Sequence, residues 1–370
     1  MKVSVIIPAY NSSEAIGRCI TSLKAQTLDE CEFIIVDDCS SDNTVELASS
    51  LIQDDNRFII LVQQTRTDPF QARVRGINAA SGEYIMFLDA DDEFSTTACE
   101  IAYNTIKEQE TDIFCFGSQV IPAENTAPAE IAHTQHYLNS YEGFSGKIFG
   151  KQAVLDCYFK TNKFGISTSL WKKIFRRQPL LEAVNKATPA APLRYGQDLL
   201  QLIMTMLHIE SIYVDNSLKL HRYFLGAGAT SQAVGALSIK NFQRMLTTRN
   251  SLDCLISYLH EQQINPAIAK LAIKHSTHSY LNTCSGNFWY LNNDDMLEGF
   301  HQLYNTWGEA IYSTPFFYSP TNLIRFKRYV VKKLDKSNPL RTKLNKKFYT
   351  LFLSIPIYKS KLYLKILFKR

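Results

Sequence analysis

The sequence predicts an α/β fold, with a Rossmann-like, mostly parallel sheet followed by a mainly helical C-terminal region. Over the first 120 residues, short β-rich runs alternate with helical patterns, an order typical of a parallel sheet covered by helices on both faces. From 238 to about 312 the apolar residues follow a helical period instead. With 370 residues and 45% hydrophobic content, the chain can bury a full-sized core.

The expected strands are nearly all apolar, as strands buried on both faces of a sheet should be. Helical patterns near 13–26, 43–53, 70–80 and 96–108 separate them, and the short connections imply right-handed β-α-β units. The five expected strands are Val3–Ile7, Phe33–Val36, Phe58–Val62, Tyr84–Leu88 and Ile113–Phe116.

The rest of the chain divides by composition. Residues 121–147 lose periodicity and gather Pro, Ala, His and Asn, which is typical of a long loop, and we expect a flap over a site. Further expected helices lie near 150–160 and from Gln197. We therefore expect an α/β domain over 1–235 with halves 1–120 and 121–235, a helical domain over 236–320, and a basic amphipathic tail over 321–370.

The net charge of +5 is unevenly distributed. Residues 322–370 contain 15 Lys and Arg against one acidic residue, so the remainder of the chain carries −9. This pattern indicates an acidic body with a basic tail that seeks an anionic partner.

The cysteines and the N-terminus indicate a cytoplasmic protein. The eight cysteines are scattered and form no C-x-x-C pair, so we expect reduced thiols. The N-terminus enters a strand at once, without the order of a signal peptide, and no segment reaches roughly 18 apolar residues.

The most informative motif is a buried strand that ends in three carboxylates, Leu88-Asp89-Ala90-Asp91-Asp92. Ligands of open α/β sheets bind beyond the carboxyl ends of strands, and residues i and i+2 of an extended segment point the same way. Asp89 and Asp91 should therefore face one pocket. Two adjacent carboxylates repel each other unless a cation neutralises them, and Mg²⁺ or Mn²⁺ fits that need. The alternative is a polar turn without a ligand.

A second acidic pair, Asp37 and Asp38, ends the second expected strand. A carboxylate here could accept hydrogen bonds from a nucleobase or ribose, or it could simply fix the turn. We favour the ligand role for Asp38, and for Asp42 we favour a helix cap. The end of the first strand, Pro8-Ala9-Tyr10-Asn11, would place an aromatic ring and backbone groups beside the same base.

These motifs resemble family 2 glycosyltransferases of the GT-A fold, of the bacterial surface-polysaccharide type. By that similarity, Asp38 contacts the nucleobase, often uracil, and Asp89-Ala90-Asp91 forms the D-x-D motif that meets the ribose and the metal-bound diphosphate. Arg73 would contact donor phosphate or acidic neighbours or, alternatively, form a surface ion pair. The matching segments are Val5–Asn11, Val36–Thr44, Ala72–Ile77 and Ser81–Asp92.

The resemblance continues into the second half of the α/β domain. The stretch Trp171–Arg177 is similar to the family's W-x-K-L-Y-R-R, which implies an acceptor-side position for Lys173 and Trp171. The family's Glu-Asp pair then opens a helix, and Asp198 matches its catalytic base, although Gln197 replaces the Glu. A helix N-terminal acid favoured by the dipole is the alternative for Asp198.

A third stretch, Leu220–Phe224, is similar to the family's tyrosine-arginine segment, and Gly226–Ser231 to the flexible loop that follows it. We expect His221 or Arg222 to reach the diphosphate, with His221 as a further metal ligand or, alternatively, a structural residue. The segment Thr65–Phe70 departs from the family, because it lacks the usual glycine-containing run.

The expected activity is therefore metal-dependent, inverting sugar transfer. The donor would be a nucleotide-diphosphate sugar, UDP-linked by preference, and the acceptor a hydroxyl of a saccharide or glycolipid in surface polysaccharide synthesis. Two alternatives stay open: transfer to a polyprenyl phosphate, and a catalytically silent binding subunit of the same fold. A dinucleotide-dependent oxidoreductase is disfavoured, because no G-x-G-x-x-G follows the first strand.

The basic tail, residues 322–370, is expected to attach the protein peripherally to the inner face of the cytoplasmic membrane. Its Lys and Arg side chains would meet anionic lipid while its aromatic side chains enter the interface. The alternatives are a basic helix packed on the body or an RNA-binding arm, and we expect no nucleic-acid partner. A homodimer is left open.

Overall fold

The computed structural model describes residues 1–122, 145–162, 165–225, 238–288 and 295–308, with a few single positions between these ranges. Most of the expected flap, the Gly226–Ser231 loop and the basic tail lie outside the described residues. The chain divides into two units, the first formed by Met1–Val234 with Asn250–Ile273, the second by Gly235–Arg249 with Lys274–Arg370. Residues 250–273, which we had assigned to the helical domain, thus group with the first unit.

One mixed sheet forms the centre of the first unit, with the strand order β3-β2-β1-β4-β8-β6-β9-β5 and with β7 beside β9. The first four strands in this order are parallel, whereas β8 is antiparallel to both β4 and β6. All five expected strands are present. The strands are β1 Val3–Ala9, β2 Cys31–Asp37, β3 Phe58–Val62, β4 Tyr84–Phe87, β5 Glu93–Phe94, β6 Ile113–Pro122, β7 Ser145–Phe149, β8 Lys173–Arg176 and β9 Ser211–Leu225.

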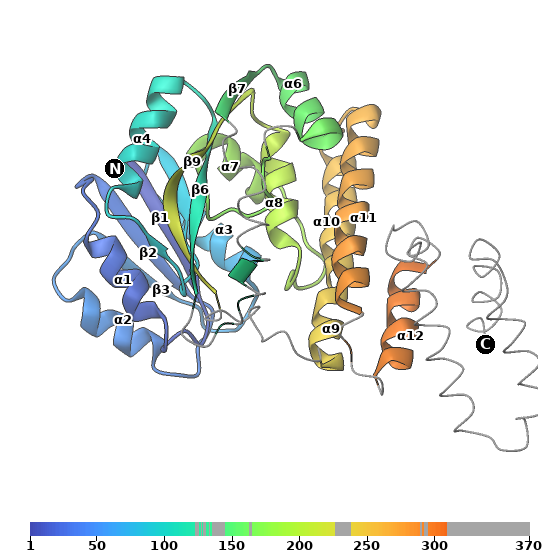
Figure 1. The fold of residues 1–370 in the computed structure, drawn as a ribbon, viewed down its shortest axis with the longest axis horizontal. Coiled ribbons are helices and arrows are strands. Elements are labelled where there is room, and N and C mark those ends of the chain that lie inside the picture. Colours follow the sequence, from blue (N-terminus) through green and yellow to red (C-terminus); the bar gives the residue numbers. More distant parts are fainter. Residues whose placement is uncertain are drawn as a thin grey trace, which may run out of the picture. The chain divides into compact units, whose positions relative to one another are not determined.

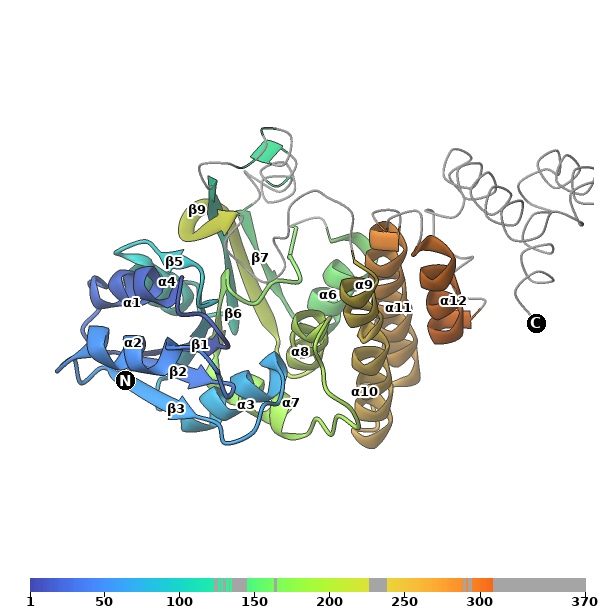
Figure 2. The ribbon, with the colours of Figure 1, turned by 90° about the horizontal axis from the view of Figure 1, so that it is seen from below.

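Helices cover both faces of this sheet. Helices α1, α2 and α4 lie on one face, and α3, α7 and α8 lie on the other (Figures 1 and 2). The bounds of these six helices are α1 Ile16–Lys24, α2 Thr44–Ile52, α3 Pro69–Ala79, α4 Ala98–Gln109, α7 Arg177–Asn185 and α8 Gln197–Met206. The chain also forms α6 Lys151–Asp156, the π-helix η1 Cys157–Thr161, α10 Thr248–Glu261 and α11 Pro266–Phe288.

Helix α3 packs unusually close to the sheet. A Cβ atom at Gly76 would stand 2.5 Å from Cγ2 of Ile6, so only glycine allows this approach of α3 to β1. The helix begins with Pro69, after Asp68 has capped it by accepting a hydrogen bond from the Gln71 N–H (2.9 Å). Because the helix packs this closely on β1, the positions of the side chains at its N-terminal end relative to the sheet are fixed.

The second unit contains helices α9 Ile239–Leu246 and α12 Met296–Trp307, together with the end of α11. Its apolar contacts include Phe242 against Phe288, with ring centroids 6.1 Å apart. No helix among the described residues combines the length and apolarity needed to span a bilayer. All eight cysteines belong to the described part of the chain and are free thiols, and all but Cys39 are buried.

Candidate active site

A cavity of about 880 Å³ opens at the carboxyl ends of β1, β2 and β4. Open parallel sheets bind their ligands at this edge. Ten of the residues predicted for the site line the cavity: Pro8, Tyr10, Asn11, Asp38, Arg73, Asp89, Ala90, Asp91, Trp171 and Asp198. Glu14, Asp42, Ala72, Gln197 and Tyr223 line it too.

Asp38 occupies a corner of the cavity and is held by the loop after β3. Its Oδ1 accepts hydrogen bonds from Nε2 of Gln63 (2.7 Å), from the backbone N–H of Thr67 (2.7 Å) and from the Thr67 hydroxyl (2.8 Å). Nearby, the Arg66 guanidinium lies 3.8 Å from the centre of the Tyr10 ring. Both the carboxylate and the ring are therefore fixed before any ligand arrives.

The turns after β1 and β2 are joined by hydrogen bonds. Asn11 accepts a hydrogen bond from the Ser41 N–H (2.9 Å) through its side-chain Oδ1, and Asp42 accepts one from the Ser13 N–H (3.1 Å). Partial burial raises the pKa of Asp42, but hydrogen bonds from Thr44 and Ser13 outweigh it and lower the pKa to about 2. Asp42 thus joins two turns of the cavity wall, and the N-cap residue of α2 is Asn43 rather than Asp42 as expected from sequence.

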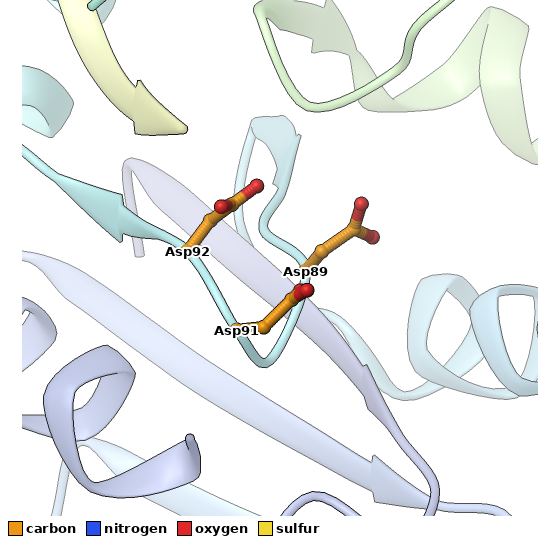
Figure 3. A group of neighbouring side chains, drawn as sticks. All are labelled: Asp89, Asp91 and Asp92. Carbon is orange, nitrogen blue, oxygen red and sulfur yellow. The ribbon is translucent and has the colours of Figure 1, made fainter. Parts of the chain in front are cut away.

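The three carboxylates after β4 come from one tight turn (Figure 3). One oxygen of each of Asp89, Asp91 and Asp92 lies within 4.8 Å of the others. Burial, followed by mutual repulsion, raises the pKa of Asp89 to about 8 and that of Asp91 to about 6, while the Arg73 charge opposes the shift at Asp89. Three oxygen ligands that resist ionising together fit a hard divalent cation. Asp89 and Asp91 line the cavity and would hold it.

Asp92 has a structural role beneath the cavity. Its Oδ1 accepts a hydrogen bond from the Phe224 N–H (2.9 Å), and its Oδ2 lies 3.2 Å from Nε2 of His221. Burial lowers the pKa of His221 to about 3, so the ring is neutral, and it stacks on Trp171 with centroids 4.2 Å apart. His221 does not line the cavity, and its ring lies beside Asp92 of the D-x-D turn, so its role as a metal ligand stays a prediction.

Arg73 links the two halves of the site. Its guanidinium is almost fully buried, and Nη1 lies 2.8 Å from Oδ1 of Asp198 while Nη2 lies 3.9 Å from Oδ1 of Asp89. The surface ion pair considered from sequence is thereby ruled out. Asp198 itself stands in the first turn of α8, behind Gly196 at φ +77°, a left-handed turn that glycine adopts without strain.

The position of Lys173 differs from the acceptor-side position expected from sequence. The side chain is fully buried, and Nζ donates to the carbonyl oxygen of Ser167 (2.8 Å) and to that of Ser169 (2.5 Å). The ammonium therefore holds the loop that leads to Trp171, and Lys173 does not line the cavity.

Sequence reasoning missed the residues that hold the motifs in place. Gln63 and Thr67 fix Asp38, and Nε of Arg18 donates to the Asp91 carbonyl oxygen (2.9 Å) while its guanidinium lies 4.5 Å from the Phe224 ring centre. Thr67 lies in the segment Thr65–Phe70, which departs from the family pattern. This departure was the signal in the sequence that could have pointed to Thr67. Arg18 has no such signal, because its partner is a backbone oxygen far along the chain.

Comparison with known proteins agrees with this geometry. Residues 4–170 match the family described as Glycosyl transferase family 2. This part of the chain is similar to glycosyltransferase family 2. The family region contains the Asp38 corner and the D-x-D turn, but it ends before Asp198.

Three curated relatives are similar to the family 2 region. They are the glycosyltransferase GlyG of Streptococcus pneumoniae (34% identical over 30% of this chain and 37% of GlyG), the putative glycosyltransferase EpsH of Bacillus subtilis (29%, half of each chain) and a Campylobacter jejuni GalNAc(5)-diNAcBac-PP-undecaprenol β-1,3-glucosyltransferase (26%, 48% of this chain and 60% of that protein). The chain thus matches about a third to 60% of their lengths.

Solved structures of Staphylococcus aureus TarS 1–349 share the fold. The complex with UDP superposes with a TM-score of 0.57 at 18% identity, covering 84% of this chain and 82% of that one. The complex with UDP-GlcNAc gives a TM-score of 0.52 at 16% identity, covering 85% and 91%. The family 2 region and its helical continuation therefore have the GT-A architecture expected from sequence.

Proposed function

We propose that the chain is an inverting glycosyltransferase that moves a sugar from a nucleotide-diphosphate donor, UDP-linked by preference, onto a hydroxyl of a saccharide or glycolipid in bacterial surface polysaccharide synthesis. The observation that carries this proposal is the meeting of three parts in one cavity. Asp38, the Asp89 and Asp91 pair, and Asp198 all line it, although they come from distant segments.

The donor side is supported by the Asp38 corner. Asp38 keeps a carboxylate at the cavity wall, and a carboxylate accepts a hydrogen bond from the N3–H of uracil, where cytosine presents only an acceptor. The Tyr10 ring offers a stacking surface beside it. TarS, whose fold the chain shares, has been solved with UDP and with UDP-GlcNAc.

The reaction side is supported by Asp198 and Arg73. In a single in-line displacement, the acceptor oxygen bonds to the anomeric carbon as the bond from that carbon to the diphosphate oxygen breaks. Asp198 takes the acceptor proton, and the nucleoside diphosphate leaves with the bonding electrons. Arg73 orients the Asp198 carboxylate through the 2.8 Å ion pair. A divalent cation at Asp89 and Asp91 would supply positive charge to the departing diphosphate.

The acceptor side is supported by two aromatic rings in the wall of the cavity. The rings of Trp171 and Tyr223 both line the cavity and lie parallel within 17°, with centroids 5.8 Å apart. Aromatic faces pack against the apolar face of a sugar ring. The basic tail would bring such an acceptor near by holding the chain at the inner face of the cytoplasmic membrane.

A donor panel tests the proposal. Wild-type protein is incubated with UDP-, GDP- and CMP-sugars, Mn²⁺ and lipid-linked or free saccharide acceptors, beside Asp91→Ala and Asp198→Asn. The control is Asp54→Ala, which removes an exposed carboxylate with no recorded partner among the described residues. We expect Mn²⁺-dependent transfer from one donor, lost in both site variants and kept in the control.

The same panel separates the alternatives. Full activity of Asp198→Asn would point to a polyprenyl phosphate acceptor, because a phosphate oxygen needs no base. Absence of both transfer and Mn²⁺-dependent UDP binding in the wild type would contradict the proposal and favour a silent binding subunit.

A further inference from the structure

Asp68 makes two hydrogen bonds that join segments far apart in the sequence. The carboxylate is only 5% exposed. Its Oδ1 accepts from the Gln71 N–H (2.9 Å) and so caps α3, while its Oδ2 accepts from the Leu193 N–H (2.9 Å). A capping residue needs only the first of these bonds. The second reaches the loop that leads into α8.

Each side of Asp68 leads to a part of the proposed active site. On one side, the neighbouring Thr67 donates both its N–H and its hydroxyl to Asp38. On the other side, the chain runs from Leu193 through the Gly196 turn to Asp198. The buried carboxylate of Asp68 therefore connects the loop that holds Asp38 to the loop that leads to Asp198.

Hydrogen bonds from α10 also hold the loop before α8. The carbonyl of Tyr195 accepts a hydrogen bond from the Ser251 hydroxyl (2.8 Å), and that of Pro192 from Nδ2 of Asn250 (3.1 Å), both from α10. These bonds hold the loop to α10 on its far side. The hydrogen bond from the Leu193 N–H to Asp68 holds the same loop to the segment after β3.

We propose that Asp68 is a positioning residue, which holds Asp198 in the same frame as the bound nucleotide by anchoring Leu193 to the loop that fixes Asp38. The proposal rests on the proposed function, since it assigns Asp198 as the base. A base acts only within about 2.6 to 3.2 Å of the proton it takes, and a displacement near 1 Å can lower the rate about 100-fold. Asp68 itself does not line the cavity.

The decisive variant is Asp68→Asn in the full chain. Asn caps a helix as well as Asp does, but its single oxygen can accept from only one of the two N–H groups. We expect kcat for transfer to fall by about 10- to 100-fold, while Mn²⁺-dependent UDP affinity, measured by calorimetry, stays within about twofold. Asp68→Ala, which also loses the cap, should show a fall in kcat of similar size.

Two kinetic results would overturn the proposal. The first is an unchanged kcat in Asp68→Asn with a fall confined to Asp68→Ala, which would assign the effect to the helix cap. The second is a loss of UDP affinity as large as the loss of kcat, which would mean that the donor pocket itself had been damaged.

Amide hydrogen exchange tests the anchor without any turnover. We expect faster exchange across residues 193–200 in Asp68→Asn than in the wild type, with exchange in the β1 and β2 strands unchanged. Equal exchange across residues 193–200 in the two proteins would overturn the proposal. A wild type that neither binds UDP nor transfers sugar would instead contradict the proposed function, and the exchange result would still decide whether Asp68 anchors the loop.

Discussion

Nη1 of Arg73 lies 2.8 Å from Oδ1 of Asp198, and the same guanidinium lies 3.9 Å from Asp89 through Nη2. One buried cation thus stands between the proposed base and the carboxylates of the D-x-D turn. Because α3 packs tightly on β1 at Gly76, the guanidinium has little freedom to leave this position. The two ion pairs of Arg73 thus link helix α3 to helix α8 and to the D-x-D turn.

Replacing Arg73 by Ala should nearly abolish transfer. The substitution leaves Asp198 and Asp89, which are both partly exposed, without the cation that lies between them. Because a displacement of the base near 1 Å can lower the rate about 100-fold, we expect kcat/KM to fall by about that factor, with Arg73→Lys intermediate because an ammonium cannot reach both carboxylates with fixed geometry. The control is Arg75→Ala on the same helix, whose exposed guanidinium donates to the Val62 carbonyl oxygen. Equal losses in the two Ala variants would contradict this role.

Without a divalent cation, the protein should lose stability as the pH rises from about 4 to 8. The pKa values of Asp89, Asp92 and Asp91 are raised from 3.8 to about 8, 7 and 6, mainly by burial. The folded state therefore binds more protons than the unfolded state in this window, and stability falls as those protons leave.

The measurement is the melting temperature in EDTA and in Mn²⁺ from pH 5 to 8. Mn²⁺ should raise it more at pH 8 than at pH 5, because ligands must be deprotonated to bind the cation. In EDTA, the melting temperature of Asp89→Asn should depend less on pH than that of the wild type. A melting temperature in EDTA that rises steadily with pH would refute the assignment.

Thr67→Val should weaken UDP binding. Valine keeps the shape and the backbone N–H of Thr67 but removes the hydroxyl that donates to Asp38 at 2.8 Å. A hydrogen bond to a charged group contributes about 1.5 to 3 kcal/mol, so the dissociation constant should rise by about tenfold or more. Thr65→Val, at an exposed position in the same loop, should leave binding unchanged when both are compared by calorimetry.

Trp171→Ala should raise the acceptor KM without changing UDP affinity. The substitution removes the ring that Tyr223 and His221 stack against, while Asp38 is held by other residues, Gln63 and Thr67. We expect about a tenfold rise, as for the loss of an aromatic contact of about 1 to 1.5 kcal/mol. Trp171→Phe, which keeps an aromatic face, should restore most of the affinity. A matching rise in the UDP dissociation constant would place Trp171 on the donor side instead.

The sheet and the motif positions follow from sequence because they depend on local patterns. A run such as Phe33–Val36 is buried at every position, and this burial is visible as unbroken apolar sequence. The D-x-D turn is equally visible, because charge directly after a buried strand has few structural explanations. Ten predicted site residues consequently line one cavity.

The partners of these residues do not follow from sequence. Lys173 and His221 carry the same motif signal as the cavity residues, yet Lys173 bonds to loop carbonyls and His221 faces Asp92. Which side of a strand faces the cavity depends on register, and β8 and β9 both pair with distant strands. Asp68 looks like an ordinary helix cap until the loop at Leu193 is seen beside it.

The position of β8 bears on the order in which the chain can fold. Strand β8 pairs with β4 through residues Tyr84 to Met86 and with β6 through Ile113 to Cys115, so it separates two strands made long before it. During synthesis, the edges of β4 and β6 stay unpaired until residue 176 has emerged. A fragment that stops at residue 170, where the family region ends, keeps both edges open and should aggregate.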